Sequence, residues 1–257
     1  MLEAKNITQV YYDKNRKENT ILSGLDLKVN EGEFVCLIGM SGCGKSTLLR
    51  LLSGLELPTS GEVISDGKKL DGPLKSGAFV FQDYALFPWR TVIRNVEFGA
   101  RINKIYPKDE IRQKAEEYLK LTHLYDYKDA YIHQLSGGMK QRVAIARALI
   151  MQPKFLFMDE PFGALDSFTR IELQNLLKDI VRERSLSVVF VTHDIDEAIF
   201  LGDRVIIMGK GSGKIEHDIA VRFEGVRDRT NGEFEIFREL IFNKFDLTRK
   251  YEIEYSI

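Results

Sequence analysis

The clearest chemical pattern in this 257-residue sequence lies at Gly39 to Thr47, which read Gly-Met-Ser-Gly-Cys-Gly-Lys-Ser-Thr. The stretch matches G-x-x-x-x-G-K-[ST], the pattern of a phosphate-binding loop. Its three glycines lack a Cβ, so the backbone can approach phosphate oxygens and donate its N–H groups to them. Lys45 can reach the terminal phosphates, and the Ser46 hydroxyl can hold Mg²⁺. The pattern predicts binding of ATP or GTP by Gly39, Ser41, Gly42, Cys43, Gly44, Lys45, Ser46 and Thr47.

The residues on either side of this loop fit a strand and a helix. Phe34 to Ile38 form an apolar run of strand length, and Leu48 to Leu52 form a short helical pattern that ends near Gly54. This order is the one that a phosphate site requires, because the helix adds its positive N-terminal end to the N–H groups of the loop. The flanks therefore support nucleotide binding, without indicating what the nucleotide does.

Apolar runs later in the chain predict a parallel sheet. Phe155 to Met158, Ser187 to Val191 and Val205 to Met208 are continuously or almost continuously apolar. Such runs are typical of parallel strands that are covered on both faces. Helical patterns at 168–183 and 195–201 predict the connections between them.

Polar side chains follow two of these runs. Asp159 and Glu160 come directly after the first, and His193 follows the second. In open parallel sheets, ligands bind at the carboxyl ends of the strands. Because successive strand residues point to opposite sides, one carboxylate can assist Mg²⁺ while the other addresses an attacking water. The His193 imidazole is well placed to bond the γ-phosphate, although each of these residues has an ordinary structural explanation when taken alone.

The other segments predict smaller elements around this core. Residues 2–12 and 21–29 alternate in character and predict two antiparallel strands, and Tyr11 in the first could stack on a base. Further expected elements are a hairpin at 61–72, a strand at 77–81 that ends at Gln82, an irregular stretch at 83–90 containing Trp89, helices at 108–121 and 138–150, and a terminal helix at 234–244.

The order of the elements predicts an α/β fold. We expect a phosphate-loop ATPase core with a mostly parallel sheet, an N-terminal antiparallel β subdomain and an inserted helical subdomain. The main domain is expected at 1–220, with its core at 1–90 and 152–220 and the helical subdomain at about 91–151. Residues 221–257 are expected to form a C-terminal helical extension.

A second glycine-containing stretch runs from Leu135 to Arg142. Ser136 is placed to cap a helix, and Gly137 and Gly138 leave the first N–H groups of that helix bare. Such a helix start suits a second phosphate-binding surface. Because the loop at Gly39 to Thr47 already cradles one nucleotide, this stretch suggests that another subunit presents the nucleotide to it.

The composition narrows the class of protein. A hydrophobic content of 44%, a charged content of 29% and a net charge of −1 are those of an ordinary globular protein, and no nucleic-acid partner is expected. Two cysteines, Cys36 and Cys43, offer neither a disulfide framework nor a zinc spacing, which favours a reducing, intracellular setting. No apolar run approaches the ~20 residues that cross a bilayer, and Met1 to Asn6 lack a signal-peptide core. Membrane association is therefore expected only through a partner.

Taken together, residues from about 2 to 210 resemble the ATPase subunits of ABC transporters. The stretch Leu135 to Gly138 resembles the signature of that family, and it precedes Arg147-Ala148-Leu149. The other matching positions, in family terms, are the Walker B pair Asp159 and Glu160, the Asp-loop Ala164-Leu165-Asp166, the switch histidine His193, the Gln-loop residue Gln82 and the adenine-stacking aromatic Tyr11.

The resemblance implies a head-to-tail dimer with two ATP molecules between the subunits. Each ATP would sit on one phosphate loop and be closed by Ser136, Gly137 and Gly138 of the other subunit, with Asp166 reaching across. Glu160 would polarise the attacking water, His193 and Lys45 would support the phosphates, and Ser46, Gln82 and Asp159 would hold Mg²⁺. Gln82 would also link the site to membrane permease subunits at the cytoplasmic face of the membrane, and a solute-binding protein would act indirectly.

A narrower resemblance is to the nitrate, sulfonate and taurine importers. It rests on Leu86 to Arg90, His193 to Ala198 and Arg227 to Arg229. The sequence departs from that branch at Met40 and Ile132, where proline is frequent, and at Gly202, where alanine is usual. These departures leave the catalytic groups intact but leave the transported solute open.

Two other functions fit the sequence less well than that of an importer ATPase. A soluble ABC-type ATPase of nucleic-acid repair or translation usually has two cassettes in one chain or a long coiled-coil insertion, and neither is present here. A small-molecule kinase built on a phosphate loop would leave Leu135 to Arg142 unexplained. We therefore expect an importer ATPase.

Overall fold

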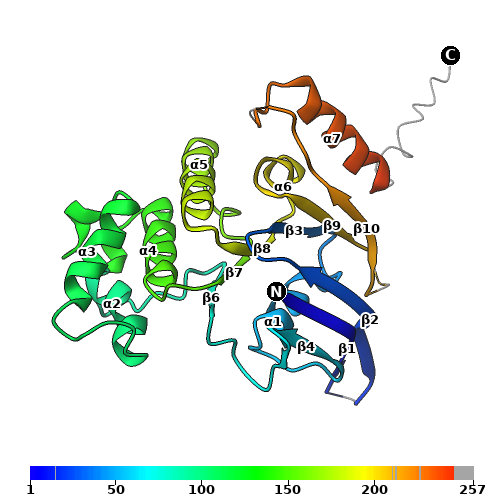
Figure 1. Cartoon of the computed structure of the whole chain (residues 1–257), viewed down its shortest axis with the longest axis horizontal. Coiled ribbons are helices and arrows are strands. Elements are labelled where there is room, and N and C mark those ends of the chain that lie inside the picture. Colours follow the sequence, from blue (N-terminus) through cyan, green and yellow to red (C-terminus); the bar gives the residue numbers. More distant parts are fainter. Residues whose placement is uncertain (15, 210, 212, 226, 246–257) are drawn as a thin grey trace.

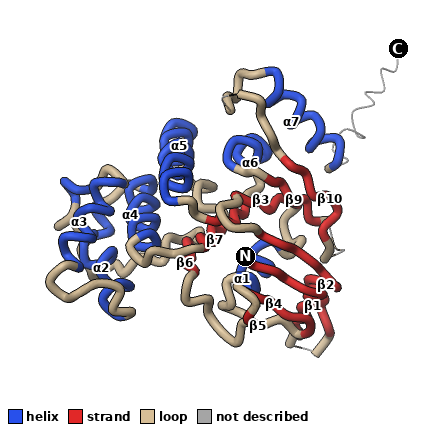
Figure 2. Tube along the Cα trace, viewed as in Figure 1, coloured by secondary structure: helices blue, strands red, loops and turns tan. Residues whose placement is uncertain are grey.

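The computed structural model describes residues 1–14, 16–209, 211, 213–225 and 227–245. Its strands form two sheets, shown in Figure 2. The smaller sheet is antiparallel, in the order β2-β1-β4-β5, and consists of β1 (Leu2–Tyr12), β2 (Glu18–Val29), β4 (Ser60–Ser65) and β5 (Lys68–Lys69).

The larger sheet has the strand order β10-β9-β3-β8-β7-β6. Its members are β3 (Phe34–Gly39), β6 (Gly77–Val80), β7 (Phe155–Asp159), β8 (Ser187–Val191), β9 (Arg204–Met208) and β10 (Ile215–Ala220). All neighbouring pairs are parallel except β9 and β10. The carboxyl ends of β3, β7 and β8 therefore meet at one edge, with β8 between the other two.

Helix α1 (Lys45–Leu52) lies between the two sheets (Figure 1). It packs against β1 of the small sheet and against β3, β7 and β8 of the large one. Four leucines of this short helix, Leu48, Leu49, Leu51 and Leu52, are fully buried. The helix that follows the phosphate loop is thus held on both sides by apolar contacts. These contacts stabilise it, because a helix this short is not stable through its own backbone hydrogen bonds.

The other face of the large sheet carries α5 (Ser167–Arg184) and α6 (Ile195–Leu201), and α7 (Gly232–Lys244) packs on α6. A separate group of helices, α2 (Val92–Ile102), α3 (Ile111–Leu121) and α4 (Gly137–Leu149), stands beyond the β6 edge in Figure 1. Helix α4 contacts both β6 and α5, so it joins this group to the sheet. No helix among the residues described is long and apolar enough to cross a membrane.

The α/β fold class expected from the sequence is confirmed, and so is each strand that the sequence predicted. The sequence did not predict α2, inside the segment expected to be helical, the short 3₁₀ helices Tyr125–Tyr127 and Ile132–Gln134, or β10. Strand β10 is an edge strand whose residues alternate between half-buried and exposed, so it lacks the continuous apolar run of its neighbours. The predicted helices begin or end within about three residues of the observed ones, as fraying ends allow.

Phe190 lies at the centre of the α5-side core, fully buried between Phe34 and Phe162, whose ring centroids are 5.7 and 5.8 Å away. Phe190→Ala is expected to lower the free energy of unfolding by about 3–5 kcal/mol, because it leaves a cavity among packed side chains. The measurement is urea denaturation.

The matched control is Phe168→Ala, since the Phe168 side chain is 82% exposed. This change is expected to move the free energy of unfolding by no more than about 0.5 kcal/mol. Equal effects of the two substitutions would show that the core is not organised as described.

Candidate nucleotide-binding and hydrolysis site

The phosphate loop connects the end of β3 to the start of α1, as the sequence predicted. Gly44 directly precedes the helix with a φ of 103°, a conformation that residues with a side chain rarely adopt. A Cβ at this position would also lie 2.8 Å from Leu22 Cδ2 of β2. The glycine is therefore required both by the turn and by the close approach of the small sheet.

Lys45 is the buried cation of the loop, with only 6% of its surface exposed. Its ammonium group donates hydrogen bonds to the carbonyl oxygens of Gly39 at 2.8 Å and Met40 at 3.1 Å. Both acceptors are neutral, so the positive charge is held in place without an anionic partner at those bonds. A phosphate group arriving in the loop would supply that partner.

Ser46 and Asp159 meet where α1 begins and β7 ends. The Ser46 hydroxyl donates to Asp159 Oδ1 at 2.8 Å. Burial raises the pKa of the Asp159 carboxyl, and the neighbouring Glu160 adds to that effect. A divalent cation would favour the charged carboxylate, and a hydroxyl with a carboxylate is the oxygen donor set that Mg²⁺ prefers. These two groups fit a Mg²⁺ ion bound together with phosphate oxygens.

Gln82, the third residue expected at the metal, follows β6. Strand β6 pairs with β7, so Gln82 comes after the same edge of the sheet as Asp159. Its side chain is exposed and has no hydrogen bond to Ser46 or Asp159 in the described part of the chain. The next residues are tied to α4, because the Arg147 guanidinium donates to the carbonyl oxygens of Tyr84 at 2.8 Å and Ala85 at 2.6 Å.

Glu160 and His193 are brought into direct contact. The distance from Glu160 Oε2 to His193 Nδ1 is 3.2 Å. Glu160 has a φ of 41°, in the left-handed region, and its N–H donates to Val191 O of the neighbouring strand at 3.0 Å. A strained backbone at a polar strand end is typical of functional positions. The two side chains that the sequence places on separate strands thus form one pair.

Tyr11 lies at the same cavity as the phosphate loop. This cavity, of about 270 Å³, is lined by Tyr11, Ile21, Ser41, Gly42, Gly44, Lys45, Ser46, Thr47 and Glu160. The Tyr11 hydroxyl donates to Glu56, which also accepts a hydrogen bond from Arg50 Nε at 2.6 Å. Glu56 and Arg50 were missed by sequence reasoning, since no pattern links the loop after α1 to the end of β1.

The Ser136 stretch lies elsewhere in the chain. Ser136 Oγ accepts from Met139 N at 3.3 Å, which confirms the predicted cap of α4. Ser136 and Gly137 are exposed, and neither they nor Gly138 line the cavity of the phosphate loop. Helix α4 stands apart from α1 in Figure 1. One chain therefore does not bring its own signature to its own phosphate loop.

Asp166 is also turned away from that cavity. It caps α5, and its Oδ1 accepts from Thr169 N at 3.0 Å. This hydrogen bond holds the pKa of the Asp166 carboxyl below its usual range. The capped turn sits beside the signature, because a Cβ on Gly138 would lie only 2.3 Å from Thr169 Cγ2. Asp166 and the signature thus belong to one surface, formed where α4 meets α5.

The comparison with protein families decides the class. The model of the ABC transporter family matches residues 22–163. The chain belongs to the ABC transporter family. Among its relatives are an uncharacterised ABC transporter ATP-binding protein of Methanocaldococcus jannaschii, 45% identical over 94% of this chain and 90% of the relative, and the aliphatic sulfonates import ATP-binding protein of Bacillus subtilis, 40% identical over 98% and 96%. The nitrate import ATP-binding protein of Synechocystis is 42% identical over 95% of this chain and 91% of the relative.

Solved structures of ABC proteins align with this chain over most of its length. A dimeric ATP-binding cassette in a post-hydrolysis state, bound to ADP and Pi, aligns with a TM-score of 0.78 and 37% identity, over 87% of this chain and all of that one. A subunit of an ABC transporter complex from Clostridium perfringens aligns with a TM-score of 0.76 and 32% identity, over 96% and 94%. This ABC chain is an ATPase.

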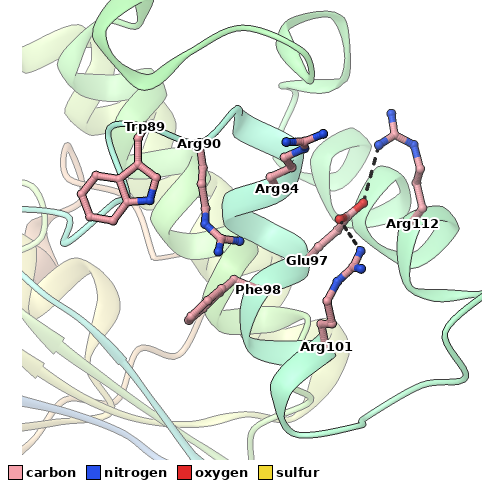
Figure 3. A pocket seen from close by; sticks show the side chains of 7 residues that line it. All are labelled: Trp89, Arg90, Arg94, Glu97, Phe98, Arg101 and Arg112. Carbon is pink, nitrogen blue, oxygen red and sulfur yellow. Dashed lines mark hydrogen bonds and ion pairs between the residues drawn. The ribbon is translucent and has the colours of Figure 1, made fainter.

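The helical group carries a second cavity, of about 650 Å³ (Figure 3). It is lined by Trp89, Arg90, Arg94, Glu97, Phe98, Arg101 and Arg112. Glu97 is the single carboxylate among four arginines, and it pairs with Arg101 at 2.9 Å and Arg112 at 3.6 Å. The Trp89 side chain is 71% exposed, and it stands at one side of the cavity in Figure 3. Arg112 also pairs with Glu116 at 3.8 Å and Asp129 at 3.6 Å. An exposed tryptophan beside several arginines is a typical contact surface for another protein.

Gly138→Ala is expected to reduce the free energy of unfolding by roughly 1–3 kcal/mol, because the added methyl group would overlap Thr169. The measurement is chemical denaturation of the full chain. Thr169→Ser removes the overlapping Cγ2 atom, so the double variant is expected to regain most of the loss. Failure of the second change to restore stability would show that the contact between α4 and α5 is not the cause.

Proposed function

We propose that this chain is the ATPase subunit of an ABC importer and works as a head-to-tail dimer of two copies. Each of two ATP molecules would bind one phosphate loop and be closed by Ser136, Gly137 and Gly138 of the second copy. The observation that carries the proposal is the separation of the two phosphate-binding surfaces. The signature is an exposed helix start outside the cavity of its own phosphate loop. A second copy supplies what each site lacks, and a related cassette is dimeric with ADP and Pi bound.

The proposed chemistry is positioning and charge neutralisation around the transferred phosphoryl group. Lys45 would leave the carbonyl oxygens of Gly39 and Met40 and bind the phosphates. Glu160 would orient and polarise the attacking water, and His193, 3.2 Å from Glu160, would support the γ-phosphate. Tyr11, fixed by Glu56, would stack on the adenine.

The remaining roles concern the metal and the communication between subunits. Mg²⁺ would be held by Ser46 and Asp159, with Gln82 joining when nucleotide is bound. When bound, this ion neutralises charge on the β- and γ-phosphates. Asp166 would leave the cap of α5 far enough to reach across the dimer. Arg147 ties the segment after Gln82 to α4, so movement at the metal would be passed to the signature helix.

The importer assignment is supported by the names of relatives, which act in the import of aliphatic sulfonates and of nitrate. The solute is proposed to be a small molecule of the nitrate, sulfonate or taurine kind or a related one, carried by separate permease subunits and delivered by a solute-binding protein. The chain would lie on the cytoplasmic face of the membrane, bound to the permease. Its proposed domains are 1–220, with the helical subdomain at about 91–151, and the extension from 221.

The permease is proposed to contact the cavity around Trp89. Four arginines and one carboxylate line this surface, although Arg112 also pairs with Glu116 and Asp129 nearby, and Trp89 adds an exposed aromatic face. A permease segment with an apolar side chain and a carboxylate would fit it. A soluble ATPase of repair or translation is not favoured, because the two relatives named above with a stated activity are import proteins and the net charge is −1.

Glu160→Gln is expected to retain ATP binding and to trap the closed dimer while hydrolysis falls by roughly 10²–10⁴-fold. The amide keeps the size of the side chain but cannot polarise water as a carboxylate does. Lys45→Ala is expected to lose ATP binding instead. The measurements are phosphate release, nucleotide binding and sedimentation. Vigorous turnover of Glu160→Gln would remove Glu160 from its proposed role.

Trp89→Ala is expected to reduce recovery of the permease when the tagged chain is purified from native membranes, while hydrolysis by the isolated chain stays unchanged. Tyr127→Ala is the control, since Tyr127 is another exposed aromatic residue and does not line this cavity. Permease recovery equal to wild type would exclude Trp89 from the contact. Recovery of ribosomes or repair factors in place of a multi-span protein would contradict the importer assignment itself.

A further inference from the structure

The stretch Arg227-Asp228-Arg229 lies beyond the ATPase core, yet both arginines reach back into it. The Arg227 guanidinium donates to the carbonyl oxygens of Gly202 at 2.8 Å and Val221 at 3.2 Å, which fixes the segment against the end of α6. Arg229 lies over the ring of Phe200, 4.1 Å from its centroid, and donates to Gln174 Oε1 of α5. The first arginine anchors the segment, and the second contacts a polar group inside the core.

Gln174 also donates a hydrogen bond to a buried carboxylate. Its Nε2 donates to Glu197 Oε1 at 2.6 Å, and the two residues are only 2% and 4% exposed. The Thr192 hydroxyl favours the charged form of the Glu197 carboxyl and so acts to lower its pKa. The same hydroxyl accepts from Asp194 N at 3.0 Å, and the Glu197 N–H donates to Asp194 Oδ1 at 3.1 Å. Thr192 and Asp194 are the two neighbours of His193 in the chain. The buried pair therefore holds the backbone on both sides of that histidine.

Carboxylates gather at the start of α6, and the cations that face them come from α5 and from the chain beyond residue 220. The first turn of α6 carries three carboxylates, on Asp194, Asp196 and Glu197. Arg170 of α5 pairs with Asp194 at 3.2 Å, and it also donates to Leu165 O, next to Asp166, at 3.1 Å. The other cations come from beyond residue 220. Arg238 of α7 holds Asp196 through two hydrogen bonds, of 2.7 and 2.8 Å. Arg229 is near enough to all three carboxylates for their charges to act to raise its pKa.

We infer that Arg229 is a positioning residue for His193, and that the segment after residue 220 sets the rate of hydrolysis through Gln174, Glu197 and Thr192. The inference rests on the role of His193 given under the proposed function. Burial raises the pKa of the Glu197 carboxyl, so this group depends strongly on its donors. Without Arg229, the Gln174 amide loses the contact that orients it, and Glu197 and Thr192 shift. His193 then loses its alignment with Glu160, where a misplacement of about 1 Å can cost roughly 10²-fold in rate.

The test compares full-length variants in steady-state ATP hydrolysis. Arg229→Ala is expected to lower kcat by roughly 3- to 30-fold with an unchanged KM for ATP, because the phosphate loop and Tyr11 are untouched. Arg229→Lys, which can still lie over Phe200 and donate to Gln174, is expected to restore most of the loss. The matched control is Arg222→Ala, which removes an exposed arginine of the same segment and is expected to leave kcat unchanged.

A purely structural role for Arg229 would lower the melting temperature and the fraction of protein that binds nucleotide, while kcat per nucleotide-binding molecule would equal that of the wild type. That result, or a wild-type kcat for Arg229→Ala, would overturn the inference. His193→Ala distinguishes this failure from failure of the proposed function. If His193→Ala is inactive while Arg229→Ala hydrolyses normally, only the positioning role is wrong; if His193→Ala hydrolyses normally, the catalytic role of the histidine is wrong.

Discussion

The burial of α1 between the two sheets is the constraint on which the site depends. The four leucines of this helix have no contact with solvent, and the helix packs on β1 as well as on β3, β7 and β8. Its N-terminus, and with it Lys45 and Ser46, is thereby fixed at the edge where β7 and β8 end. The positions of Asp159, Glu160 and His193 relative to the phosphate loop then follow from the pairing of β3 with β8 and of β8 with β7.

Two ionisable side chains at this edge, Lys45 and Asp159, would be stabilised in their charged forms by bound ligands. Lys45 is buried against neutral carbonyl oxygens, and burial raises the pKa of the Asp159 carboxyl. Bound triphosphate would supply an anionic partner for Lys45, and a divalent cation would favour the charged form of Asp159. The same separation of parts appears on a larger scale at Ser136, an exposed cap with no nucleotide of its own. In the proposed dimer, ligand and a second copy would together complete such a site, which would link nucleotide binding to association.

Much of this arrangement could be predicted from the sequence, for identifiable reasons. Continuous apolar runs mark β3, β7, β8 and β9, and the glycines and Lys45 mark the loop, because each depends on residues close together in the chain. What could not be predicted depends on contacts between distant segments. The Glu160–His193 contact requires a left-handed backbone at Glu160, and the Tyr11–Glu56–Arg50 and Arg229–Gln174–Glu197 contacts join elements far apart in sequence. Edge strand β10 was missed because only half of its residues face the protein.

The central claim is that each nucleotide lies between the phosphate loop of one copy and the signature of the other. Thiol cross-linking tests it most directly, with Ser41→Cys and Ser136→Cys introduced into one Glu160→Gln chain and a short bismaleimide as reagent. The native thiols Cys36 and Cys43 are buried, and the parent Glu160→Gln chain is the control for them. A covalent dimer is expected to form with ATP and not without it. A cross-link within one chain, or a dimer whose yield does not depend on ATP, would contradict it.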